Sequence, residues 1–136
     1  DGTRMAACHG LDSLPDLPFD KARGSGFCLF HHHVDLDLPI VIRDLSQDPR
    51  TSGNPLVEGQ PNLRFYATVP ILQPERSGGG SRYMGTLTIA STKPKDHFML
   101  DDVAYLASQA CFLAEILREL DTKTGGDPVH AVEERR

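Results

Sequence analysis

Two neighbouring segments in the middle of the chain have the patterns of hydrophobic and polar positions that predict strands. Residues 64–72 (RFYATVPIL) are largely apolar, and within residues 83–92 (YMGTLTIAST) Leu87 and Ile89 alternate with threonine and alanine. A period of two residues is typical of a β-strand that packs one face on a core. The connection (QPERSGGGS) carries three consecutive glycines, so the two segments predict an antiparallel hairpin with a mobile tip.

A period of three to four residues replaces this alternation further along the chain. At that spacing a stripe of apolar residues runs through Val103, Leu106, Ala110, Leu113, Leu117 and Leu120. Such a stripe is typical of an amphipathic helix, and Asp101 and Asp102 add the negative charge that stabilises a helix N-terminus. Residues 102–120 therefore predict a helix of about 28 Å, long enough to cross a sheet.

Shorter patterns predict two more strands and one helical turn. Residues 5–8 are a short mixed segment with strand character, and residues 38–44 (LPIVIRD) are β-branched and apolar. Pro39 lies near the start of the second segment, where a strand tolerates proline. Asn54 followed by Pro55 predicts a local turn with a capping residue and a proline at its first position.

The length and composition fit one globular domain followed by a tail. The chain has 136 residues, of which 39% are hydrophobic and 24% are charged, and a chain of this size buries a core as a single domain. Residues 122–136 lack periodicity and include Gly125, Gly126 and Pro128. We therefore expect a domain over residues 1–121 and a linker or disordered tail over residues 122–136.

The charge pattern narrows the classes of partner. Lys and Arg number 14 against 19 Asp and Glu, which gives a net charge of −5, and no segment concentrates the basic residues. Nucleic acid is therefore not an expected partner, because phosphate binding needs a basic surface. No apolar run approaches the roughly 20 residues of a membrane span, and the first residues lack the apolar core of a signal peptide. We expect a cytoplasmic protein.

The cysteines and histidines supply donor atoms without the spacing of a known site. Cys8, Cys28 and Cys111 are an odd number without a CxxC pair, which argues against a disulfide framework and a zinc ribbon. Cys28 with the run His31–His33 offers ligands for zinc or copper, but consecutive helical residues splay by about 100°. A partly exposed polar face is favoured over a metal site, and the sequence identifies no cofactor.

An ordered set of segments resembles the GAF domain family, over residues 27–120. The set comprises DLSQDPR (44–50), NPLV (54–57), RFYA (64–67), GTL (85–87), and Phe98 followed by Asp102, Leu106 and Ala110. The resemblance implies an α+β, PAS-related fold with a central antiparallel β-sheet, helices packed on it and a long C-terminal helix. Complete members open with a helix and a first strand, so residues 5–8 would be the second strand and the chain would begin inside the domain.

The resemblance also implies a regulatory module of a larger signalling protein, such as a histidine kinase, that binds a small molecule. The predicted pocket joins residues 27–34, the turn at 54–57 and one face of the sheet. Its residues are Phe27, Cys28, His31, Asn54, Leu56, Phe65, Ala67 and Leu87. The competing hypothesis is a degenerate domain that binds nothing and serves as a dimerisation spacer.

Two specialised types within the family match less well. Members that reduce methionine sulfoxide use paired cysteines, but Cys8, Cys28 and Cys111 lie on three different predicted elements. Members that carry a bilin attach it to a cysteine followed by histidine. Cys8 and His9 form that dipeptide, yet the family's attachment segment precedes Gly85 and holds no cysteine here. We expect a non-catalytic module, with a redox- or tetrapyrrole-responsive domain as an alternative.

Two interactions complete the expectations. Arg64 is predicted to pair with Asp44 or Asp48 and so tie the loop to the following strand, a contact with a ligand anion being the alternative. The long helix also has a second apolar side that carries Tyr105, Phe112 and Ile116. Because one stripe must pack on the sheet, this second side predicts a homodimer through the helix.

Overall fold

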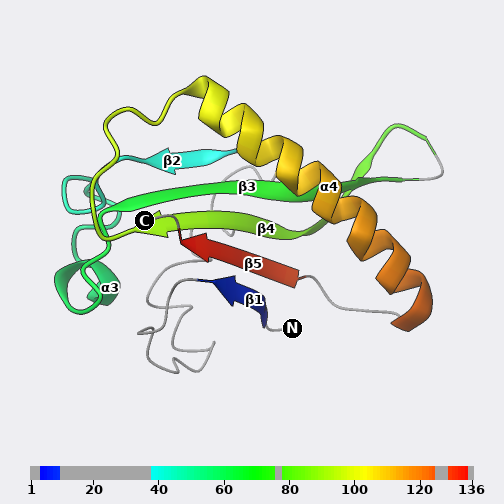
Figure 1. Ribbon diagram of the computed structural model, residues 1–136, viewed down its shortest axis with the longest axis horizontal. Helices are drawn as coiled ribbons and strands as arrows, with labels where there is room; N and C mark the ends of the chain where they lie inside the picture. The colour runs from blue at the N-terminus through cyan, green and yellow to red at the C-terminus, as the bar shows by residue number, and fades with distance from the viewer. Residues whose placement is uncertain (1–3, 10–37, 76–77, 125–128, 135–136) are drawn as a thin grey trace.

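The computed structural model describes residues 4–9, 38–75, 78–124 and 129–134 (Figure 1). Residues 4–9, 121–124 and 129–134 are described by their backbone alone. In chain order the elements are β1 (Arg4–His9), β2 (Ile40–Ile42), α3 (Pro55–Glu58), β3 (Phe65–Pro74), β4 (Ser81–Ser91), α4 (Leu100–Thr124) and β5 (Val129–Glu134). The strands form one sheet, and α4 crosses it diagonally on one face (Figure 1).

The sheet has the order β1-β5-β4-β3-β2. β3 pairs antiparallel with both β2 and β4, whereas β5 runs parallel to β4 on one side and to β1 on the other. The α+β fold with a long helix is therefore confirmed. The antiparallel part of the sheet is the part from β2 to β4.

The two parallel pairings involve a segment for which the sequence predicts a linker or disordered tail. Residues 129–134 (VHAVEE) form β5 instead. The strand follows α4, and a strand that returns to the sheet after a helix runs parallel to the strand before the helix. The segment is short and its apolar positions do not alternate cleanly, so it carries no strand signal. Hydrogen bonds to two neighbouring strands stabilise it, and a local pattern does not reveal such bonds.

The predicted hairpin is confirmed and is longer than expected. β3 and β4 pair from Phe65 opposite Ser91 to Pro74 opposite Ser81, with one register shift between Ile71 and Leu72. At the tip, Gly78 and Gly79 have φ of 105° and 88°, a backbone conformation that residues other than glycine rarely adopt. The glycine run therefore supplies the turn geometry that joins the two long strands.

Side chains from the two faces of the hairpin enter two separate hydrophobic clusters. The cluster on the α4 face contains Phe65, Ala67, Val69, Ile71, Met84, Leu87, Ile89, Leu106, Ala110 and Ala114. The cluster on the opposite face contains Ile40, Ile42, Leu45, Leu56, Val57, Leu63, Tyr66 and Ala90. β3 is thus an interior strand that is buried on both sides, which is why its sequence is almost continuously apolar.

The start of α4 is fixed by its own first turn and by β2. The Asp102 carboxylate accepts a hydrogen bond from the backbone N–H of Met99 at 2.8 Å, which satisfies one of the free donors at a helix N-terminus. The Arg43 guanidinium, just after β2, donates to the carbonyl of Phe98 at 3.0 and 3.3 Å. From this anchored start the helix runs for 25 residues, about 37 Å.

A core substitution tests the packing between β3 and α4. Ile71 is 0% exposed, so Ile71→Ala should lower the free energy of unfolding by about 2–5 kcal/mol, because it removes buried methylene groups and leaves a cavity. Leu100→Ala is the matched control, since Leu100 is 85% exposed. Chemical denaturation measures both variants. Equal small losses would contradict the packing described.

Candidate functional site

The sheet separates residues that were predicted to line one pocket. Phe65, Ala67 and Leu87 pack beneath α4, whereas Leu56 of α3 packs on the opposite face. Successive side chains of a strand point to opposite faces. The predicted set therefore combined residues on the α4 face of β3 and β4 with a residue of α3, which packs on the other face. Phe27, Cys28 and His31 lie outside the described residues.

Asn54 has a structural role at the edge of this arrangement. Its side-chain oxygen accepts a hydrogen bond from the backbone N–H of Leu56 at 2.9 Å, and Pro55 takes the first helical position. The predicted cap of the short helix is therefore confirmed. The amide oxygen of Asn54 is occupied in stabilising α3, and Leu56 and Val57 of that helix are buried in the second cluster.

A row of buried threonines lies on the sheet face that carries α3. Thr68 of β3 and Thr88 of β4 are register partners, and their hydroxyl oxygens are 2.8 Å apart. Thr86, also buried, lies two residues before Thr88. The sequence shows that threonine alternates with apolar residues in β4. The predicted pocket was placed on the apolar face of this alternation. The hydroxyls instead make the opposite face the more polar interior surface.

A cavity of about 390 Å³ lies between β4 and α4. Its walls are Leu87, Ile89, Phe98, Asp102, Tyr105, Leu106, Gln109, Phe112 and Leu113. Of the predicted pocket residues that the structure describes, Leu87 alone lines it, while Tyr105 and Phe112 belong to the predicted dimer contact. Phe98 also packs on Phe65, with the ring centroids 4.9 Å apart, so the hydrophobic cluster beneath α4 supports the cavity floor.

The cavity walls combine apolar side chains with a few polar groups. The polar residues among them are Asp102, Tyr105 and Gln109, which lie along one side of α4. Ligand pockets commonly measure about 300–1,000 Å³ and are largely apolar with a few polar groups. This cavity is therefore of a size that suits a small molecule. Among the residues described, no cluster of three histidine, cysteine or acidic side chains has the arrangement of a metal site.

The second side of α4 carries large apolar side chains that are exposed. Tyr105 is 53% exposed, Phe112 68% and Ile116 42%, and Leu120 adds a further position at 52%. The spacings of seven, four and four residues place them on one stripe of the helix. The other stripe, with Leu106 and Ala110, is buried in the core, so the exposed stripe lies on a flank of α4 beside the buried one.

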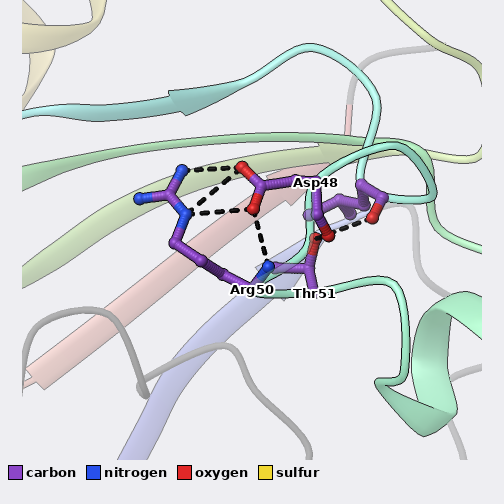
Figure 2. Close-up of polar contacts among 4 residues, drawn as sticks. Asp48, Arg50 and Thr51 are labelled. Atoms are coloured by element: carbon purple, nitrogen blue, oxygen red, sulfur yellow. Dashed lines mark hydrogen bonds and ion pairs between the residues drawn. The ribbon is translucent and has the colours of Figure 1, made fainter.

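The loop between β2 and α3 has other charge pairs than those expected. Asp48 pairs with Arg50, whose Nη2 lies 2.7 Å from the carboxylate, and the backbone N–H of Arg50 donates to the same carboxylate at 2.8 Å (Figure 2). Thr51 donates its hydroxyl proton to the carbonyl of Leu45 at 2.7 Å (Figure 2). A partner two residues away in a tight turn costs less chain ordering than a distant one. Arg50 therefore takes the place that was predicted for Arg64.

Arg64 stabilises the same loop through backbone groups. Its Nη1 donates to the carbonyls of Val57 at 2.9 Å and Leu63 at 2.8 Å. Asp44 is the acceptor for the backbone N–H and the hydroxyl of Ser46, at 3.0 and 2.6 Å. The acceptors are therefore a carbonyl within α3 and the carbonyl of the residue before Arg64, and not the carboxylates of Asp44 or Asp48.

Comparison with known proteins identifies the family. A GAF domain model matches residues 2–117, which is most of the chain, and the fold agrees with it. The chain belongs to the GAF domain family. Domains of this family are generally regulatory rather than catalytic, so a sensory or regulatory role is supported at the level of the family.

One curated relative is "Cyclic di-GMP phosphodiesterase PA2567" of Pseudomonas aeruginosa, which is 34% identical over 65 residues. The alignment covers 48% of this chain and 10% of the relative. The chain therefore corresponds to a small part of that protein. Among the described residues, none of the helices is both long and apolar enough for a membrane span.

The Asp48–Arg50 pair predicts a pH dependence of stability. The side-chain hydrogen bond from Arg50 lowers the pKa of Asp48 below its ordinary value, and the same bond raises the pKa of Arg50. A lowered acidic pKa gives stability that is present above the unfolded value, about 3.9, and is lost as pH falls through the folded value. Arg50→Met should cost about 0.2–1 kcal/mol at pH 7, as for other exposed pairs.

Denaturation of Arg50→Met and the unsubstituted chain at pH 7 and at successive values below pH 4 measures this difference. It should shrink towards zero once Asp48 is protonated in both states. Arg82→Met is the control, because Arg82 lies at the exposed start of β4, away from this loop. A difference of constant size at all pH values would mean that Arg50 acts by packing and not by charge.

Proposed function

We propose that this GAF domain is a non-catalytic sensory module of a larger cytoplasmic signalling protein, and that it couples a small ligand to pairing of α4. The observation that carries the proposal is the overlap of two features. Tyr105 and Phe112 line the cavity between β4 and α4, and both are more than half exposed on the apolar stripe. A ligand and a partner helix would therefore contact the same two side chains.

The stripe suits a second copy of α4 as its partner. It runs from Tyr105 to Leu120, about 22 Å of helix, and consists of side chains that stabilise helix pairs when they lose contact with water. A weak dimer needs about 600–800 Å² of buried surface on each partner. The stripe together with the flanking helix surface is long enough to supply an area of this order.

The cavity suits a small molecule with an apolar body and a hydrogen-bond donor. Leu87, Ile89 and Leu106 offer apolar contact, and the Asp102 carboxylate offers an acceptor at the cavity wall. A ligand in this position would change the packing of Tyr105 and Phe112, and with it the surface available to the partner helix. That is a direct route from ligand occupancy to helix pairing, which is an arrangement that a host such as a histidine kinase can use.

The relative from Pseudomonas aeruginosa, whose name describes a cyclic di-GMP phosphodiesterase, supports a signalling context. An enzyme of that class is therefore a further candidate host beside a histidine kinase. The alternative remains a degenerate domain that binds no ligand and acts as a dimerisation spacer.

Sedimentation velocity of the purified chain over a range of concentrations tests the pairing of α4. Phe112→Glu and Ile116→Glu each place a charge on the stripe and should shift the chain to monomer, because a buried unpaired charge is costly. Ala104→Glu is the matched control, since Ala104 is exposed on the same helix but outside the stripe. A monomer at all concentrations in the unsubstituted chain would remove dimerisation from the proposal.

Native mass spectrometry of freshly purified protein tests the ligand. A retained small molecule that is lost in Leu87→Phe supports the cavity, because the larger side chain fills space beside α4 while the exposed stripe is unchanged. The chain can also be refolded with and without an extract of small metabolites. A dimer that retains no molecule under either condition would favour the degenerate domain that acts as a dimerisation spacer. A molecule retained equally by Leu87→Phe would place the ligand elsewhere.

A further inference from the structure

β5 occupies an interior position in the sheet although it comes from outside the matched domain. The family match ends at residue 117, within α4, whereas β5 spans Val129–Glu134. The strand lies between β1 and β4 (Figure 1). An element that follows the matched region thus completes the sheet that belongs to it.

Both edges of β5 are paired. On one side it is in register with β4 from Gly85 opposite Val129 to Ala90 opposite Glu134. On the other side it pairs with β1 from Arg4 opposite Val129 to His9 opposite Glu133, with one register shift between Met5 and Ala7. Backbone N–H and C=O groups inside a sheet need partners, so loss of β5 would leave two unpaired rows. The position between β1 and β4 therefore favours occupation by some extended segment.

β1 depends on the occupant of this position. Within the described residues, β1 pairs with β5 and has no pairing with another strand. β2, β3, β4 and α4 already enclose the hydrophobic cluster beneath the helix. Departure of β5 would consequently release β1, while the antiparallel part of the sheet keeps its own pairing and its own core.

We propose that the position between β1 and β4 is a strand-acceptor site, and that β5 is a displaceable occupant which the β5 segment of a second copy of this chain can replace. The partner that fits is an extended segment of about six residues that runs parallel to both neighbours. Strand addition of this kind derives its affinity from backbone hydrogen bonds and its specificity from side chains at alternate positions. A segment with the sequence VHAVEE meets the first requirement, because its backbone pairs with both neighbours.

The covalent tether explains why the chain's own β5 is the usual occupant. A strand attached by a short connection has an effective concentration in the millimolar range, so a free segment competes poorly against it. A second copy gains access when the tethered strand is weakened. This acceptor site is separate from the α4 stripe, so the exchange of β5 can be tested without reference to the helix pairing proposed above.

Val132→Pro in the full chain weakens β5 at its centre, because proline has no backbone N–H and is poorly tolerated inside a sheet. Hydrogen exchange should show β1 and β5 losing protection together, by at least about tenfold, while β3 stays protected. Val129→Pro is the matched control, since a strand tolerates proline at its first residue. Protection of β1 that persists in Val132→Pro, or loss that spreads equally to β3, would overturn the proposal.

A fluorescent peptide of residues 127–136 then probes the vacated site in trans. It should bind Val132→Pro at least about tenfold more tightly than it binds the unsubstituted chain, where the tethered strand competes, and it should restore protection to β1. A peptide with Val132 replaced by proline is the control. Binding without restored β1 protection, or no difference between the two chains, would count against a strand-acceptor site.

A crosslink provides a second measurement that needs no destabilised variant. Val132 is the register partner of Cys8, and neighbouring strands lie about 4.7–4.9 Å apart, within the Cα separation of about 4.4–6.8 Å that a disulfide spans. On oxidation, Val132→Cys should form a disulfide between Cys8 and the introduced thiol and lose all peptide binding, while reduction restores weak binding. Ala131→Cys is the control, because its register partner is Ala7.

The distribution of that disulfide between chains tests the second half of the proposal. At low protein concentration the bond should form within one chain, and at high concentration a fraction should link two chains, as non-reducing electrophoresis of Val132→Cys with Cys28 and Cys111 replaced by serine would show. Bonds confined to single chains at every concentration would overturn exchange between copies. No bond at all would contradict the position of β5 beside β1.

Discussion

The fold depends on burial of both faces of β3. From Phe65 to Val69 every residue of this strand is buried, with odd-numbered side chains beneath α4 and even-numbered ones towards α3. A strand in this position must pair on both edges and be covered on both faces, which fixes β2 and β4 beside it, α4 on one side, and the loop that carries α3 on the other. The two faces then serve different purposes, because one is largely aliphatic and the other includes the Thr68–Thr88 hydroxyl pair.

α4 connects this core to the cavity and to the exposed stripe. Leu106, Ala110 and Ala114 anchor it on the sheet, and the Arg43 contact with the Phe98 carbonyl holds its start. With one side fixed in this way, the positions of Tyr105 and Phe112 above β4 follow from helix geometry. A helix that is immobile on its core side can still respond on its exposed side, where two aromatic side chains form part of a cavity and extend into solvent.

The sequence predicted those elements whose signal is local. The hairpin, the long helix and the Asn54 cap each depend on neighbouring residues, and all three are present. What it missed depends on geometry that a local pattern does not contain. Arg50 is closer to Asp48 in sequence than Arg64 is. The turn geometry is needed, however, to show that Arg50 donates two hydrogen bonds to the Asp48 carboxylate. The predicted pocket joined residues from both faces of the sheet, since a period of two shows which residues share a face and not which face meets α3. β5 was missed because its pairing partners are remote in sequence.

β5 has structural influence although its segment carries no strand signal. It follows α4 after four residues, so the helix and the interior strand are linked through a short stretch of chain. A change in packing that moved the C-terminal end of α4 would shift the point of attachment of β5, and release of β5 would remove a constraint on that end of the helix. A ligand or partner that changes the packing of α4 in this way would change the affinity of the position between β1 and β4 for a strand. By linkage, occupation of that position would change the affinity for the ligand or partner by the same factor.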